Sequence, residues 1–135
     1  MTRLLFALAA FALALTAPAT GAERVKLPED ILGTWCLESV DESADREVYH
    51  RADCGPGTGK PSWSWLLMGP DRMRAHELDC RTRRIIKRID RKLPIYRLTM
   101  FCWDEGSTGV DHVEIWRAED KLMVSPRRMM AMPIE

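Results

Sequence analysis

The fold is decided by the stretch Cys80-Arg-Thr-Arg-Arg-Ile-Ile-Lys-Arg-Ile-Asp-Arg-Lys-Leu-Pro-Ile-Tyr-Arg-Leu-Thr-Met-Phe-Cys102. Its second half alternates between two faces, and one of them is formed by Tyr96, Leu98, Met100 and Cys102. Alternation with a period of two predicts a β-strand, and residues 82–89 supply its antiparallel partner. If the chain turns near Arg91, the two cysteines stand opposite each other, because both are equally far from residue 91. Opposed residues of a hairpin lie close enough for a disulfide.

All four cysteines follow the first 35 residues: Cys36, Cys54, Cys80 and Cys102. An even number of cysteines in a small exported chain indicates disulfides. With Cys80 paired to Cys102, the second bridge is expected to join Cys36 to Cys54. Each bridge closes a loop of about twenty residues and contributes roughly 3 kcal/mol to stability by the chain-entropy estimate. A zinc site is disfavoured, because the chain has neither a Cys-x-x-Cys motif nor a histidine cluster.

Outward from the hairpin, the other segments also have the composition of strands and turns. Strands are expected at 31–39, 48–51, 63–68, 73–79, 110–117 and 121–124. The segment 41–47, with four acidic residues against one arginine, is expected to be too polar for the core. Seven or eight short strands predict an all-β fold, an antiparallel meander that closes into a small barrel or a sandwich.

The first 22 residues have the three-part layout of a cleaved helical signal peptide: a positive start, an apolar run at 4–15 and a tail of small residues. The apolar run is shorter than the roughly 20 residues that span a bilayer, so no transmembrane anchor is expected after cleavage. Residues 23–135 are then expected to form one disulfide-bonded β domain, periplasmic or secreted. The 20 basic and 20 acidic residues balance, which argues against a nucleic-acid partner.

The tripeptide Gly33-Thr34-Trp35 resembles the opening of calycin-type barrels, the lipocalins, avidins and small bacterial protease inhibitors. The resemblance implies a barrel whose closed end is plugged by Trp35, with an arginine after the last strand, Arg127 or Arg128, stacked on the ring. The order Gly-x-Trp-Cys, Cys54, Glu77-x-x-Cys80 and Cys102 also resembles small uncharacterised exported proteins of Gram-negative bacteria. That second likeness implies no activity.

The charges are unevenly distributed along the chain. Residues 72–97 hold ten basic and three acidic residues, whereas residues 23–53 hold nine acidic and four basic. The densest cations define a basic hairpin: Arg81, Arg83, Arg84, Lys87, Arg88, Arg91 and Lys92. Such a patch could bind lipopolysaccharide, anionic phospholipid or an acidic protein. A solvated face that protects a sheet edge is the alternative interpretation.

The five tryptophans admit two interpretations. Trp63 and Trp65 alternate with Ser64 and would form one wall, suited either to a sugar or lipid ligand or to filling the barrel together with Trp35. Trp103 and Trp116 share their strand faces with polar residues. They are therefore the rings expected to be exposed to a partner.

Signals for catalysis or cofactors are weak, and we expect neither. No nucleophile elbow, phosphate loop or His-Glu-x-x-His motif occurs in the sequence. A metal held by His50, His76 and Glu114 is a minor alternative, since isolated strand histidines are usually structural. Copper(I) binding by the thioethers of Met129, Met130 and Met132 is another.

Two function classes remain. The first is a non-enzymatic barrel that binds an apolar or amphipathic ligand, which requires an open interior. The second is a protein-interaction module, such as an inhibitor of a protease or lysozyme. It requires an interior filled by the chain's own side chains, with loops or the segment 23–30 projecting.

Overall fold

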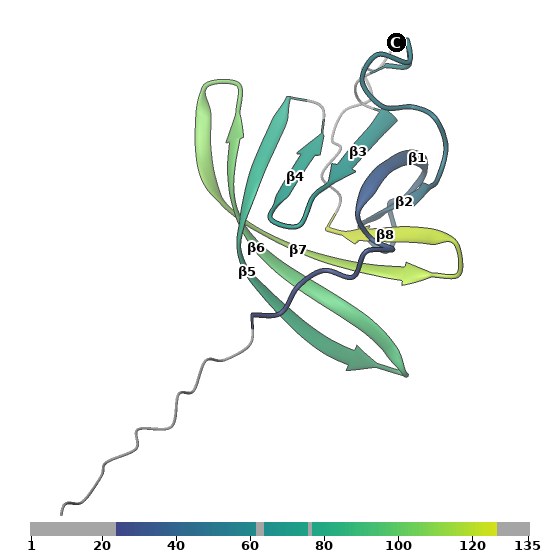
Figure 1. Cartoon of the computed structure of the whole chain (residues 1–135), viewed down its shortest axis with the longest axis vertical. Coiled ribbons are helices and arrows are strands. Elements are labelled where there is room, and N and C mark those ends of the chain that lie inside the picture. Colours follow the sequence, from purple (N-terminus) through teal and green to yellow (C-terminus); the bar gives the residue numbers. More distant parts are fainter. Residues whose placement is uncertain (1–23, 62–63, 76, 127–135) are drawn as a thin grey trace, which may run out of the picture.

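The computed structural model describes residues 24–61, 64–75 and 77–126. Within them the chain forms eight strands: β1 Gly33–Asp41, β2 Arg46–His50, β3 Trp65–Met68, β4 Arg72–Ala75, β5 Leu78–Asp90, β6 Leu93–Asp104, β7 Ser107–Ala118 and β8 Lys121–Ser125 (Figure 1). Every neighbouring pair is antiparallel, and the sheet closes into a barrel, which confirms the all-β barrel prediction. The expected signal peptide, residues 1–22, lies outside the described residues.

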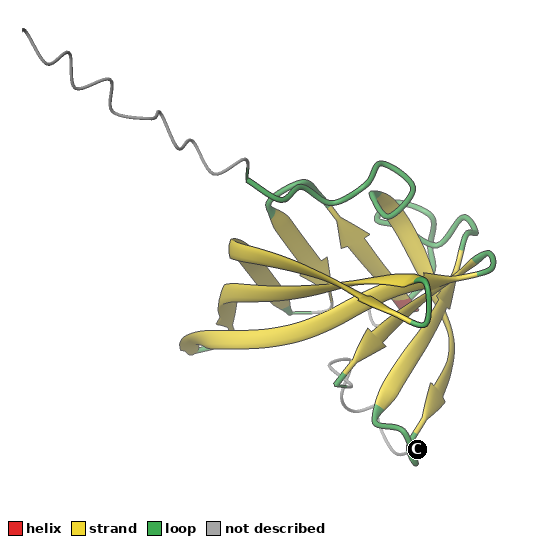
Figure 2. Ribbon diagram, turned by 90° about the horizontal axis from the view of Figure 1, so that it is seen from below, coloured by secondary structure: helices red, strands yellow, loops and turns green. Residues whose placement is uncertain are grey.

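The ring of strands departs from a continuous meander at one place. Its order is β1-β2-β8-β7-β6-β5-β4-β3, so β1 lies between β2 and β3, and the chain passes β1 on its way from β2 to β3. The meander therefore runs from β3 to β8, and β2 closes the ring against β8. Figure 2 shows the strands curving around a common interior.

The hairpin of β5 and β6 turns over two residues rather than one. Arg91 and Lys92 form the turn and both have positive φ, 48° and 68°, the pattern of a tight type I′ hairpin turn. A two-residue turn alone would place Cys80 opposite Trp103. A bulge between Thr82 and Arg84 shifts the register by one residue and restores the pairing of Cys80 with Cys102. The hairpin extends past the short strands β3 and β4 (Figure 1).

The strand expected at 73–79 is divided in the structure. β4 ends at Ala75 and β5 begins at Leu78, with Glu77 at a φ of 54° in the turn between them. Alternation that continues across residues 73–79 resembles one long strand in the sequence. The division produces β4 as a separate strand, which lies between β3 and β5 in the barrel.

Both disulfides have the expected partners, Cys36–Cys54 and Cys80–Cys102. The bridge between β5 and β6 belongs to the main core, and Cys80 is fully buried. The bridge from Cys36 lies on the outer face of β1, because Cys36 follows Trp35, whose ring points inward. Two disulfides are typical of an oxidising, extracytoplasmic compartment. Among the described residues, no helix is long and apolar enough to span a bilayer.

Candidate functional site

The barrel interior is occupied by its own side chains. Inward-facing residues from all eight strands form one buried cluster, which includes Trp35, Tyr49, Tyr96, Met68, Met73 and Met100. Leu27 and Ile31, from the segment that precedes β1, are buried in the same cluster. In the described part of the segment 23–30, which was expected to project if the protein is an interaction module, Leu27 is thus packed into the barrel, whereas residues 24–26 are exposed. This packed interior resembles a protein core more than a ligand chamber.

Trp35, the expected plug of the barrel, is fully buried in the cluster that fills the interior. Its indole Nε1 donates a hydrogen bond to the Ile31 carbonyl at 2.8 Å, which holds the preceding turn against the ring. The guanidinium carbon of Arg51 lies 3.7 Å from the ring centroid, and that of Arg117 lies 5.1 Å from it. Cations over an indole face stabilise the packing of the Trp35 side chain. Arg127 and Arg128, expected from the calycin resemblance, lie outside the described residues.

The two arginines also tie down the turn before β1. Arg51 donates hydrogen bonds from its guanidinium to the carbonyls of Asp30, Leu32 and Thr34, at 3.0, 2.6 and 3.1 Å. Arg117 donates to the same Asp30 carbonyl at 2.8 Å. Burial, and then the neighbouring positive charge of Arg117, lowers the pKa of Arg51. Arginine stays protonated under such shifts, so Arg51 and Arg117 hold the turn before β1 in place through charged hydrogen bonds.

Glu47 is buried, and the expectation that segment 41–47 stays outside the core is therefore wrong at its last residue. Its carboxylate accepts a hydrogen bond from the Tyr49 hydroxyl, two residues along β2 and on the same inward face. Burial, and then the negative charge of Glu47, raises the pKa of Tyr49. Both side chains are shut off from solvent, so they stabilise the interior and have no access to a substrate.

Trp65 lies outside the barrel, so the interpretation that it fills the interior is wrong. It packs with the Cys36–Cys54 bridge in a second buried cluster on the outer face of β1 and β3, with Leu67 against them. Trp63, its expected companion in a ligand wall, lies outside the described residues. With only 8% of its surface exposed, the Trp65 ring anchors the loop that carries Cys54.

The structure separates the residues of the expected basic hairpin. Arg81, Arg84 and Arg88 point outward from β5, whereas Lys87 lies opposite the inward-facing Tyr96, and Arg91 and Lys92 form the turn. The outward arginines continue onto β4 as Arg72 and Arg74 and onto β6 as Arg97. The charged surface is thus a wall of the barrel rather than a hairpin tip.

We call this wall the arginine face and define it by its outward-facing residues: Arg72, Arg74, Arg81, Arg83, Arg84, Arg88 and Arg97, with Phe101, Trp103 and Val110. Register places Arg72, Arg81, Phe101 and Val110 in one row across four strands. The next row contains Arg74, Asp79 and Trp103.

Ion pairs neutralise only part of the arginine face. Arg72 pairs with Asp79, its Nε lying 2.8 Å from Oδ1, and Arg88 pairs with Glu114 at 3.0 Å and Asp90 at 3.7 Å. The remaining five arginines form no ion pair with a described residue, and all are exposed: Arg74, Arg81, Arg83, Arg84 and Arg97.

Aromatic and aliphatic side chains are exposed within the same face. Trp103 is 39% exposed and Val110 is 64% exposed, both large fractions for apolar side chains. The Phe101 ring meets the Trp103 ring edge to face, with centroids 5.0 Å apart, and the guanidinium of the bulge residue Arg83 lies 5.9 Å from the Phe101 centroid. The sequence indicated Trp103 as an exposed ring. The alternation of the same strand also places Phe101 on its face. The sequence did not indicate Val110 or Arg72 as neighbours, because their proximity depends on strand pairing.

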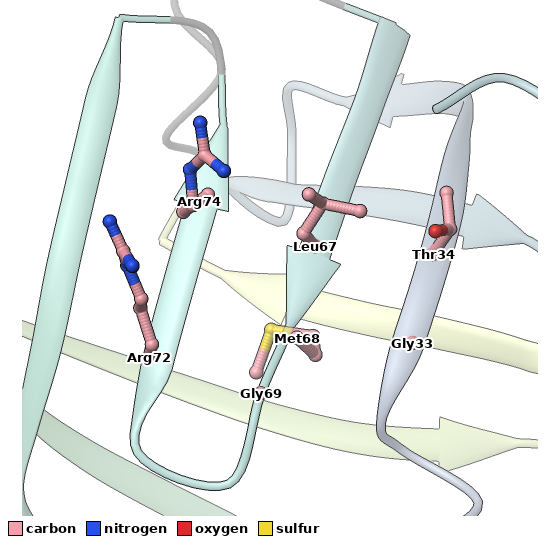
Figure 3. A pocket seen from close by; sticks show the side chains of 7 residues that line it. All are labelled: Gly33, Thr34, Leu67, Met68, Gly69, Arg72 and Arg74. Carbon is pink, nitrogen blue, oxygen red and sulfur yellow. The ribbon is translucent and has the colours of Figure 1, made fainter. Parts of the chain in front are cut away.

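A shallow pocket of about 270 Å³ borders the arginine face. Its walls are mainly apolar: Gly33 and Thr34 from β1, Leu67 and Met68 from β3, and Gly69 from the turn that follows. Figure 3 shows Arg72 and Arg74 of β4 along one side of it. The pocket thus joins apolar surface to two guanidinium groups that belong to the arginine face.

The minor metal alternatives gain no support from the described residues. These contain no group of three or more His, Cys, Asp or Glu side chains placed to hold an ion. Thr99 Oγ1 lies 3.2 Å from His112 Nδ1 on the outer wall. His76 and the methionines 129, 130 and 132 lie outside the described residues, so both alternatives stay untested.

Comparisons of the chain with protein-family models, with curated proteins and with solved structures found no match. The likeness to calycin-type barrels therefore rests on the closed, eight-stranded antiparallel barrel and on Trp35.

Proposed function

We propose that this protein is an exported binding module that meets an anionic partner through the arginine face, on the outside of the barrel. The observation that carries the proposal is that five exposed arginines on one wall form no ion pair with any described residue, in a chain whose total charge is zero. A local field of one sign attracts a partner of the opposite sign even when the net charge vanishes.

The interior argues against the alternative of a carrier for an apolar ligand. Trp35, Tyr49 and Met100 are fully buried in the cluster that fills the barrel, and the pocket beside Arg72 and Arg74 opens on the outer wall. A carrier encloses most of its ligand in a preformed cavity. An outer surface instead suits a partner that is too large to enter the barrel.

Retention on a phosphate-bearing cation-exchange resin tests the proposal. At pH 7.5 and low salt, the wild type should be retained despite its sequence pI of about 6.8. Reversing three charges of the arginine face, with Arg81→Glu, Arg84→Glu and Arg97→Glu, should abolish retention.

The matched control reverses three cations outside the arginine face, Arg24→Glu, Lys26→Glu and Lys60→Glu, and so has the same net charge. This control variant should stay on the resin and elute at nearly the wild-type salt concentration. Identical elution of the two triple variants would show that total charge alone matters and would refute the proposal.

A further inference from the structure

We infer that the anionic partner of the arginine face is a phospholipid bilayer surface, on which Trp103 and Val110 enter the headgroup layer while the arginines bind phosphates. The inference rests on the proposed function and names its partner. It follows from the kind of cation, from the exposed apolar side chains among them and from the pocket beside them.

The cations of this face are all arginines. A guanidinium presents five donors in a planar fork that fits a phosphate in a bidentate manner, which an ammonium cannot do. Asp79 lies near enough to Arg74 and Arg81 for their charges to lower its pKa, but its hydrogen bonds are to Arg72. Five of the seven arginines form no ion pair with a described residue, so their donors can meet an external anion: Arg74, Arg81, Arg83, Arg84 and Arg97. Dispersed phosphates in a plane match such a surface better than one compact anion does.

The apolar side chains among the arginines are of the types found at membrane interfaces. Tryptophan is enriched at the level of lipid headgroups, where its ring is half apolar and half polar. Trp103 is the penultimate residue of β6 and Val110 lies near the start of β7, so both lie toward the hairpin end that these two strands share. An acidic protein partner would bury the same side chains only by offering an apolar patch of its own, whereas a bilayer always offers one.

The pocket adds a third element. Its apolar walls, formed in part by Leu67 and Met68, lie directly beside Arg72 and Arg74. This arrangement fits an amphipathic anion, with a short apolar portion in the pocket and a phosphate at the arginines. A surface that binds only a polar polyanion requires no apolar pocket.

Co-sedimentation with vesicles tests the inference on the oxidised protein, in which both disulfides are formed. Vesicles of phosphatidylcholine with roughly 30% phosphatidylglycerol are compared with vesicles of pure phosphatidylcholine. The anionic lipid gives the first kind a negative surface potential. Binding should require the anionic lipid and weaken steeply with salt, since surface charges are screened over about 8 Å at physiological ionic strength. Each arginine near such a surface contributes about fivefold in affinity, so losing three of them weakens binding by about 100-fold, and the triple charge reversal, which also adds three repulsive charges, should weaken it by at least that much.

A second variant separates lipid docking from simple attraction to anions. Trp103→Ser with Val110→Ser leaves every charge in place and removes only the exposed apolar groups. Vesicle binding should fall by about tenfold, the order expected when apolar surface no longer leaves water, whereas retention on the phosphate resin should not change. Both side chains are exposed, so folding should survive, and far-ultraviolet circular dichroism of the variant checks this.

The outcomes distinguish this inference from the proposed function. Retention on the resin without binding to anionic vesicles, or vesicle binding that is indifferent to the double variant, would overturn the inference and leave an acidic protein as the partner. Free inorganic phosphate should compete no better than chloride of equal ionic strength; stronger competition would mean that a soluble phosphate compound is the ligand. A wild type that binds neither the resin nor the anionic vesicles would refute the proposed function as well.

Discussion

Replacing Trp35 with alanine should lower the free energy of unfolding by about 4 kcal/mol or more. The side chain is fully buried, and truncating a tryptophan in a packed core costs about 3–5 kcal/mol. The Ile31 carbonyl also loses the donor that lies 2.8 Å away, which adds about 1 kcal/mol. A domain of this size has only about 5–15 kcal/mol in all, so the variant should be close to the limit of folding.

Urea unfolding of the oxidised protein, followed by far-ultraviolet circular dichroism, measures the effect. With a slope of about 1–3 kcal/mol per molar urea, the midpoint should fall by at least 1 M. The conservative variant Trp35→Phe keeps most of the apolar ring but lacks the N–H donor, and it should lose less than half as much stability.

Trp103→Ala is the matched control, because Trp103 is 39% exposed on the outer wall. Surface substitutions of this kind usually change stability by less than about 1 kcal/mol. If the Trp35→Ala and Trp103→Ala midpoints shifted equally, Trp35 would not be the plug of the barrel and the reasoning would be refuted.

Two further predictions concern the hairpin and the ion pair beside it. Deleting the bulge residue Arg83 should make the hairpin regular and leave Cys80 opposite Cys102, because Thr82 and Arg84 then pair with the consecutive residues Met100 and Thr99. Titration with a thiol reagent should find no free thiol, and two free thiols would show that Arg83 is not the extra residue. The hydrogen bond from Arg72 holds the pKa of Asp79 below its ordinary value of 3.8, so the pair stabilises the fold above pH 4 and loses this effect as the pH falls through the lowered pKa. Carboxyl NMR titration should show the Asp79 pKa rising in Arg72→Ala, and an unchanged pKa would contradict the assignment.

The sequence predicted features that depend on local pattern. Strand number, the all-β class and the pairing of the cysteines all follow from alternation and from the symmetry of one hairpin. The symmetry argument reached the correct pairing through a turn that is one residue too short. Arg83 provides the missing residue as a bulge, and nothing in the alternation of residues 82–89 distinguishes a bulged position from a regular one.

Features that depend on non-local contacts were not predicted. The place of β1 between β2 and β3 is a choice among strand pairings that alternation does not encode. Glu47 is buried because Tyr49 supplies a hydroxyl on the same face, and a composition argument over 41–47 counts only charges. Trp65 points outward because the covering loop, tied by Cys54, gives it an apolar partner there.

The candidate site shows the same division. The sequence located the basic residues along one hairpin, but the arginine face crosses four strands. Arg72, Phe101 and Val110 become neighbours only when β4, β5, β6 and β7 pair. The sequence of one hairpin therefore predicted that the surface is positively charged. The register between strands determines which side chains lie next to each other on it.

The most direct test of binding through the outer wall is a titration of the ¹⁵N-labelled protein with anionic vesicles, followed by the loss of amide signal intensity. Because interaction with the slowly tumbling vesicle broadens the contacting residues first at low lipid, signals of the arginine face, such as those of Arg81, Trp103 and Val110, should weaken before the rest. Signals of residues behind the opposite wall, such as Tyr49, should weaken later. Earliest loss at Tyr49 or along β1 and β2, or uniform insensitivity to the vesicles, would contradict binding through the arginine face.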